Sequence, residues 1–295
     1  MIWACPICRQ PLQASSGGVS CSANHQFDRA KQGYLPLLPA HHRRSATPGD
    51  DRAMLEGRRE FLQAGFYAPL ADLLAEQLCG VGESRESVTL LDSGCGEGYY
   101  LGRIMARARD LVVRLKPFGF DISKDAAKLS ARALSADGVS AAQSRGANSA
   151  DNSVDTASIA VASSFQLPVL DESVDVVLRI FSPGDMDEVA RVLRADGEFW
   201  RVVPGPKHLY QLKQALYDEV TLHEIPASPE GFETFESTPL VFPVELTNSQ
   251  AIEQLLQMTP FVWRGSEQGK AVLRESSALT VTADFVLQRY RKVAV

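Results

Sequence analysis

The chain has 295 residues, of which 45% are apolar and 22% charged, and this ordinary globular composition excludes a largely disordered protein. It contains no run of about 18 apolar residues, and its start lacks the basic and apolar regions of a secretory signal, so we expect a cytoplasmic protein with reduced thiols. The net charge of −6 argues against a polyanionic partner, but residues 1–59 hold eight Lys and Arg against four Asp and Glu. This asymmetry indicates a polyanion near the N-terminus.

The first 35 residues hold three of the five cysteines and too few apolar side chains for a core of their own. Cys5, Cys8, Cys21 and His25 follow the pattern C-x2-C-x12-C-x3-H. Zn²⁺ prefers four sulfur or nitrogen ligands in a tetrahedron, and four protein ligands leave no open position for a catalytic water. The spacing therefore predicts a structural zinc-binding module over residues 1–35.

Residues 36–50 are predicted to be a linker, because prolines bound them and polar and basic residues fill them. A helix is expected to run from about residue 51 to Gln63, capped by Asp50 or Asp51, and a second helix is expected over residues 68–79. Basic side chains of the linker and of the first helix are candidates for contacts with RNA phosphates: Arg43, Arg44, Arg52, Arg58 and Arg59.

From Val88 onward, short apolar strands alternate with helices, and this alternation predicts a parallel sheet covered on both faces. Residues 137–156 are rich in Ser, Ala, Asn and Asp and are predicted to form a mobile insertion. The pattern is weaker beyond residue 205, where we expect a helix near 208–220 and a strand over 279–290. The strands predicted before residue 205 span residues 88–92, 116–121, 159–162, 175–180 and 198–203.

A glycine-rich loop follows the first predicted strand, and residues 92–98 have the form D-x-G-x-G-x-G. Glycines allow the sharp turns and close backbone approach that a bound cofactor needs, and the helix that follows offers free N–H groups. The dinucleotide fingerprint requires a small residue at position 99, where this chain has Tyr. The loop instead resembles the cofactor loop of class I methyltransferases.

Polar residues at the ends of the following strands extend the expected cofactor site. Asp121 ends the second strand, where a carboxylate accepts hydrogen bonds from ribose hydroxyls. The short side chains of residues 162–164 leave room for an adenine ring. Residues 179–183 end the fourth strand, where many methyltransferases bind their acceptor, but they match neither an exocyclic-amine motif nor a Pro-Cys nucleophile motif. Transfer to a ring nitrogen, a hydroxyl group or a small molecule remains.

Across nearly its whole length the chain resembles the RlmA-type 23S rRNA guanine-N1 methyltransferases. The segments that carry this resemblance are CPIC, CSANHQFDRAKQGYLPLLP, HHRRSATPGD, RREFLQAGFYAPL, LDSGCGEGYY, VASSFQLP, RVVPGPKHLYQLK and LLQMTPFVWR. The resemblance implies a Rossmann-like S-adenosylmethionine-dependent domain over residues 51–295, a zinc module that helps hold a hairpin of 23S rRNA, and a homodimer. The insertion at 137–156 is longer than the family usually has, and Ser93 replaces an apolar residue.

The loop, the strand-end acid and the resemblance together define the expected site. The resemblance adds Tyr67, Cys95, Gly96 and His208 as cofactor contacts. The full set expected to bind S-adenosylmethionine is Tyr67, Asp92, Gly94, Cys95, Gly96, Glu97, Gly98, Asp121 and His208.

The reaction and its alternatives stay open at this point. No residue is identified as the acceptor of the guanine N1 proton, which could pass to water or to a carboxylate such as Asp185. A small-molecule methyltransferase of the quinone-like type, or a catalytically inactive zinc-ribbon RNA-binding protein, would share much of this sequence pattern.

Overall fold

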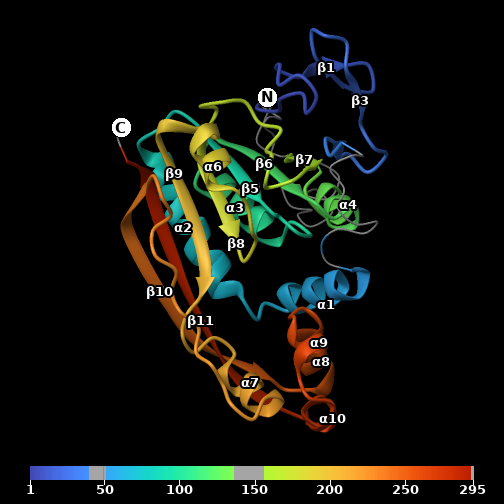
Figure 1. Cartoon of the computed structure of the whole chain (residues 1–295), viewed down its shortest axis with the longest axis vertical. Helices are drawn as coiled ribbons and strands as arrows, with labels where there is room; N and C mark the ends of the chain where they lie inside the picture. Colours follow the sequence, from blue (N-terminus) through green and yellow to red (C-terminus); the bar gives the residue numbers. More distant parts are fainter. Residues whose placement is uncertain (40–48, 50, 136–155, 294–295) are drawn as a thin grey trace.

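The computed structural model describes residues 1–39, 49, 51–135 and 156–293 (Figure 1). Two sheets organise the chain: a small antiparallel sheet near the N-terminus and a large central sheet of eight strands. The small sheet consists of β1 (Gln13–Ser15), β2 (Gly18–Ser20) and β3 (Gln26–Asp28).

The central sheet has the order β10-β11-β9-β8-β5-β6-β7-β4. Every adjacent pair of strands from β9 through β8, β5, β6 and β7 to β4 is parallel. The remaining strand pairs are antiparallel, because β11 runs antiparallel to both β9 and β10. From β5 the chain proceeds outward through β6 and β7 and then returns to β8 on the other side of β5, so the switch point of the topology lies between β5 and β8. The bounds are β4 (Leu35–Pro36), β5 (Val88–Ser93), β6 (Leu115–Asp121), β7 (Ser158–Val161), β8 (Val174–Ile180), β9 (Leu193–Pro204), β10 (Phe232–Leu246) and β11 (Leu279–Lys292).

Helices lie between the strands and at the lower end of the molecule as drawn in Figure 1. The first begins as predicted, because the carboxylate of Asp51 accepts a hydrogen bond from the N–H of Met54 at 2.9 Å and so caps the helix. It packs against α8, where Gly57 allows close approach to Gln257. The helices are α1 (Arg52–Gln63), α2 (Ala68–Glu83), α3 (Tyr99–Asp110), α4 (Lys124–Ala133), α6 (Met186–Val192), α7 (Tyr210–Leu216), α8 (Ser249–Gln257), α9 (Phe261–Arg264) and α10 (Glu267–Glu275).

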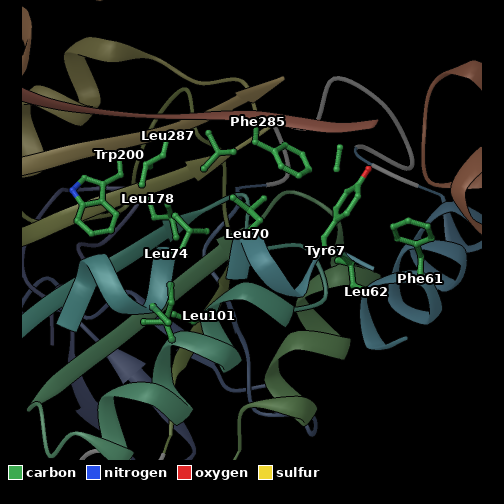
Figure 2. Packing of buried hydrophobic residues seen from close by; sticks show 14 of the residues in the cluster. Phe61, Leu62, Tyr67, Leu70, Leu74, Leu101, Leu178, Trp200, Phe285 and Leu287 are labelled. Carbon is green, nitrogen blue, oxygen red and sulfur yellow. The ribbon is translucent and has the colours of Figure 1, made fainter. Parts of the chain in front are cut away.

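Two hydrophobic cores lie on opposite sides of the central sheet. The larger core lies between the sheet and a group of helices that includes α1, α2, α3, α4 and α8. Figure 2 shows part of this core, including Leu70 and Leu74 of α2 beside Trp200 and Leu287. The smaller core joins α6 and the N-terminal segment to strands β5 to β9. In this core Trp3 is fully buried, and its indole Nε1 donates a hydrogen bond to Ser158 Oγ at 2.8 Å. The N-terminal segment is therefore packed as one layer of the α/β fold.

The start of the predicted linker is part of this packed structure. Leu35 and Pro36 pair with β7 as a parallel edge strand, and Leu37 and Leu38 are buried. Residues 40–48 and 50 of that linker, with Arg43 and Arg44, lie outside the described residues, as does nearly all of the predicted insertion at 137–156.

The parallel arrangement expected for the strands of residues 88–203 is confirmed, and the sheet extends further at one edge. The hairpin of β10 and β11 adds two antiparallel strands, and β10 was missed because Pro239 and Pro243 interrupt its strand pattern. The predicted strand over 279–290 is confirmed as β11, while the helix expected near 208–220 is shorter, as α7. In the described part of the chain, no helix is long and apolar enough to cross a membrane.

Candidate active site and metal centre

The glycine loop connects β5 to α3 at the carboxyl edge of the sheet. Gly94, Gly96 and Gly98 have φ angles of +89°, +56° and +87°, which other residues rarely adopt. The N–H groups of Gly94 and Cys95 both donate to the carbonyl of Phe120 at 2.9 Å, so the loop is attached to the end of β6. These contacts place the loop beside the switch point, where open α/β sheets bind their ligands.

Gly96 and Asp121 lie next to each other at the carboxyl edge of the sheet. A Cβ added at Gly96 would have only Arg58 Nη1 within 4 Å, at 3.7 Å. Asp121, at the end of β6, accepts hydrogen bonds from the N–H of Gly96 at 3.0 Å and from the N–H of Ser123 at 2.7 Å. These two bonds fix the orientation of the carboxylate at the end of β6, where this kind of sheet places the acid that binds ribose hydroxyls.

Three acidic side chains gather at this edge. Asp92 is only 2% exposed, and burial, with the nearby charges of Asp121 and Glu97, raises the pKa of Asp92 to about 8. Clustered carboxylates favour a cationic ligand, as the sulfonium of S-adenosylmethionine is. Burial also raises the pKa of Cys95 well above its ordinary value, so its thiol stays protonated and is no nucleophile.

Tyr67 and His208, which only the family resemblance indicated, lie together on the larger core. Tyr67 packs edge-on between Phe61 and Phe285, with ring centroids 5.1 and 4.9 Å away (Figure 2). Its buried hydroxyl has no hydrogen-bond partner among the described residues. An orphaned buried hydroxyl is costly, and a ligand at the glycine loop would supply its partner. The donor set therefore fits S-adenosylmethionine.

The ring of His208 lies 6.2 Å from that of Tyr67 and 4.7 Å from that of Phe285. Its Nδ1 accepts a hydrogen bond from the backbone N–H of Asp284 at 3.2 Å, so the proton of the neutral ring is on Nε2. Burial, with the nearby His223 and Lys213, lowers the pKa of His208 to about 3. The imidazole is therefore neutral at physiological pH.

The end of β8 supplies two residues of the site that the sequence did not single out individually. Ser182 Oγ donates a hydrogen bond to the carbonyl of Ser93 at 2.6 Å and lies against Gly94. Phe181, the preceding residue, stacks on His208 with 28° between the ring planes. The sequence of residues 179–183 predicts only that this segment ends the fourth strand. No local pattern predicts the hydrogen bond of Ser182 to Ser93 or the stacking of Phe181 on His208.

The four predicted zinc ligands meet at one point. The ligand atoms of Cys5, Cys8, Cys21 and His25 all lie within 4.8 Å of one another. Cys5 Sγ and Cys21 Sγ are 3.5 and 3.4 Å from His25 Nδ1, and Cys8 Sγ is 3.6 Å from Cys21 Sγ. A tetrahedral Zn²⁺ with sulfur ligands at about 2.3 Å and nitrogen at about 2.0 Å gives edges of roughly 3.5–3.8 Å. The geometry therefore fits the zinc site that the spacing predicts.

The described arginines among the RNA candidates differ in their surroundings. Arg52 is paired with Glu56 at 2.9 Å, Arg58 lies beside Gly96 of the cofactor loop, and Arg59 is exposed. Asp185, considered as a proton acceptor, caps α6 by accepting the N–H groups of Asp187 and Glu188 at 2.8 and 3.2 Å.

Asn in place of Asp92 should stabilise the cofactor-free protein in alkaline solution. Because the folded pKa of about 8 exceeds the unfolded value of about 3.9, the native state keeps a proton that the unfolded state releases, and the parent loses stability as the pH rises from about 4 to about 8. We expect the advantage of the variant in unfolding temperature to be smaller near pH 5 and to reach its full size near pH 8. Calorimetric scans at the two pH values measure this difference. An equal shift at both pH values would contradict the assignment.

Comparison with known proteins places the chain in a family. The zinc-ribbon family model described as "RlmA, N-terminal" matches residues 3–46. The Bacillus subtilis protein YxjB, whose name assigns it to the 23S rRNA (guanine-N1)-methyltransferases, is 31% identical over 292 residues, which cover 96% of this chain and 94% of YxjB. The 23S rRNA (guanine(748)-N1)-methyltransferase of Streptomyces fradiae is 30% identical, over 72% of this chain and 66% of its own.

A solved S-adenosylmethionine-dependent methyltransferase of Thiobacillus denitrificans, in complex with S-adenosyl-L-homocysteine, aligns over 74% of this chain and 90% of its own, with a TM-score of 0.42 and 15% identity. The identity to the curated relatives extends over almost the full length of this chain and of YxjB. It covers both the zinc cluster and the glycine loop. The chain therefore belongs to the family of 23S rRNA (guanine-N1)-methyltransferases.

Proposed function

We propose that the chain transfers a methyl group from S-adenosylmethionine to N1 of a guanine in 23S rRNA. The observation that carries this proposal is the glycine loop beside the switch point, with Asp121 held by the N–H of Gly96 and three acids at the same edge. The relatives supply the substrate, since their names specify guanine N1 of 23S rRNA.

The residues of the site act mainly by positioning. Asp121 is expected to accept the ribose hydroxyls, while the backbone of residues 94–98 approaches the amino-acid part of the ligand and Asp92 faces its positive charge. When bound, S-adenosylmethionine supplies a methyl group already activated by the sulfonium. What the protein adds is alignment of that methyl with guanine N1, and alignment alone gives large rate gains. Both cap hydrogen bonds of Asp185 go to Oδ1, so water and Asp185 Oδ2 both stay open as acceptors of the N1 proton.

The zinc module is proposed to help hold a hairpin of the rRNA. It is packed on the sheet through Trp3 and β4, so RNA bound to it would have a fixed position relative to the methyl donor. Arg59 of α1 lies exposed on the same N-terminal half and would contact phosphate. The same proposal includes a homodimer, which the family resemblance implies. It also includes a cytoplasmic location, where thiols stay reduced.

Methyl transfer to rRNA tests the proposal directly. Purified protein should transfer tritiated methyl groups to 23S rRNA from cells that lack the corresponding enzyme, and nuclease digestion should release 1-methylguanosine. Asp121→Ala should weaken S-adenosylmethionine binding about tenfold or more, since charged hydrogen bonds contribute about 1.5–3 kcal/mol. The matched control Asp125→Ala removes an exposed carboxylate paired with Lys128 and should leave binding unchanged.

The alternatives give different results in the same assays. A small-molecule methyltransferase would bind the cofactor but label no rRNA. An inactive RNA-binding protein would bind rRNA and show no affinity for S-adenosylmethionine. Either result would reject guanine N1 of 23S rRNA as the acceptor.

A further inference from the structure

Phe181, at the end of β8, has an unusual backbone conformation. Its φ angle is +53°, and its side chain is 49% exposed. For a bulky residue a positive φ is rare and sterically unfavourable. Such strain persists only where the surroundings determine it, and it is concentrated at functional sites.

This conformation directs the ring to one side of the sheet. Arg179, two residues earlier, packs over the ring of Phe199 in the smaller core, with 5.3 Å from its guanidinium carbon to the ring centroid. Strand alternation would send residue 181 to that same side. Phe181 instead lies 6.1 Å from His208 and 5.7 Å from Phe285, on the side of the larger core. The left-handed φ therefore turns the phenyl ring toward the side that holds Tyr67.

The ring also lies close to the expected methyl donor. Ser182, its neighbour in the chain, donates to the carbonyl of Ser93 and touches Gly94 of the cofactor loop. Phe181 is thus one residue removed from a direct contact with that loop. It follows β8, which forms one side of the switch point, where open α/β sheets bind their ligands.

We propose that Phe181, supported from behind by His208 and Phe285, is the surface on which the acceptor guanine stacks. This inference rests on the proposed function and names the nucleobase subsite of that reaction. A guanine presented to an active site must leave its helical stack, and aromatic side chains replace the lost stacking. A half-exposed phenyl ring on a second flat ring offers such a surface.

The surroundings of the ring agree with a flat, uncharged ligand. Burial keeps His208 neutral by lowering its pKa, so the rings that support Phe181 carry no charge. Phe285 and His208 are buried, which leaves Phe181 as the half-exposed member of the three. The stacking face is therefore apolar, in contrast to the acidic cofactor edge formed around Asp92.

Substitutions that separate aromatic character from bulk test the subsite. Phe181→Ala and Phe181→Leu should lower kcat/KM for 23S rRNA about tenfold to 100-fold, because stacking on an aromatic contributes about tenfold or more per base. Phe181→Tyr and Phe181→Trp should stay within a few-fold of the parent. S-adenosylmethionine affinity should be unchanged in all four. Phe235→Ala is the matched control and should behave as the parent. It removes a partly exposed aromatic side chain of β10, which lies against Arg291 of β11.

Two outcomes would contradict the stacking of guanine on Phe181 while leaving the proposed function intact. Parental activity of Phe181→Leu would show that bulk alone is needed. A loss confined to S-adenosylmethionine affinity would make Phe181 a cofactor contact.

A binding measurement decides the matter even if the parent methylates no rRNA. In the presence of S-adenosylhomocysteine, millimolar guanosine 5′-monophosphate should quench the fluorescence that Phe181→Trp adds to the parent signal. No quenching would reject the stacking surface, whereas inactivity of the parent on rRNA together with quenching would reject only the proposed acceptor.

Discussion

Serine in place of Cys8 should release the zinc ion and lower the unfolding temperature of the whole domain. The binding energy of a structural zinc site is also folding energy, with apparent values of about 10–16 kcal/mol in small zinc modules. Without the ion, the segment that buries Trp3 and Val19 against the sheet has too small a core of its own to stay folded. We therefore expect both the N-terminal layer and the smaller core to loosen.

Elemental analysis and calorimetry measure this loss. The parent should contain one zinc per chain and Cys8→Ser close to none, with an earlier unfolding transition. Cys79→Ser is the matched control, because Cys79 lies buried in α2 outside the metal cluster, and it should retain the ion. Full zinc content in Cys8→Ser, or a zinc-free parent, would contradict the assignment of the four ligands.

Alanine in place of Gly94 should weaken S-adenosylmethionine binding by about 100-fold. Two unfavourable effects combine at this position. The φ of +89° disfavours any residue with a Cβ, and the added Cβ would lie only 2.6 Å from Ser182 Oγ. Together they cost about 2–3 kcal/mol or more. The loop can relieve the strain only by moving away from the cofactor or by breaking the hydrogen bond between Ser182 and Ser93.

Gly231→Ala provides the comparison for Gly94→Ala. Its φ of +76° is similarly strained, but a Cβ there meets nothing within 4 Å. Both variants should lose some stability in calorimetric unfolding, and only Gly94→Ala should lose affinity in calorimetric titration. Equal affinities would mean that the cofactor does not depend on the backbone at this turn.

The parts of the fold that depend on local signals could be predicted from the sequence. Asp51 precedes an apolar stripe and caps α1 as expected, since a cap depends only on its own helix. The spacing of the three cysteines and His25 also acts locally, because pairs three and four residues apart converge within one turn. The glycines of residues 92–98 specify their own turns.

The parts that depend on distant segments could not be predicted in the same way. Tyr67, Phe285 and His208 meet because β11 runs antiparallel beside β9, and no local pattern states that pairing. The family resemblance indicated Tyr67 and His208 but not the contact between them. The positive φ of Phe181 follows from tertiary packing, since a phenylalanine by itself disfavours it.

The two outermost strands of the central sheet both carry proline. Pro36 lies in β4 at one edge, and Pro239 and Pro243 lie in β10 at the other. Proline has no N–H to offer a further strand, and edge prolines discourage the association of sheets between molecules. Both edges of this sheet are therefore protected from adding a strand of another molecule. A homodimer of this chain would accordingly associate through side-chain surfaces, with each sheet ending inside its own subunit.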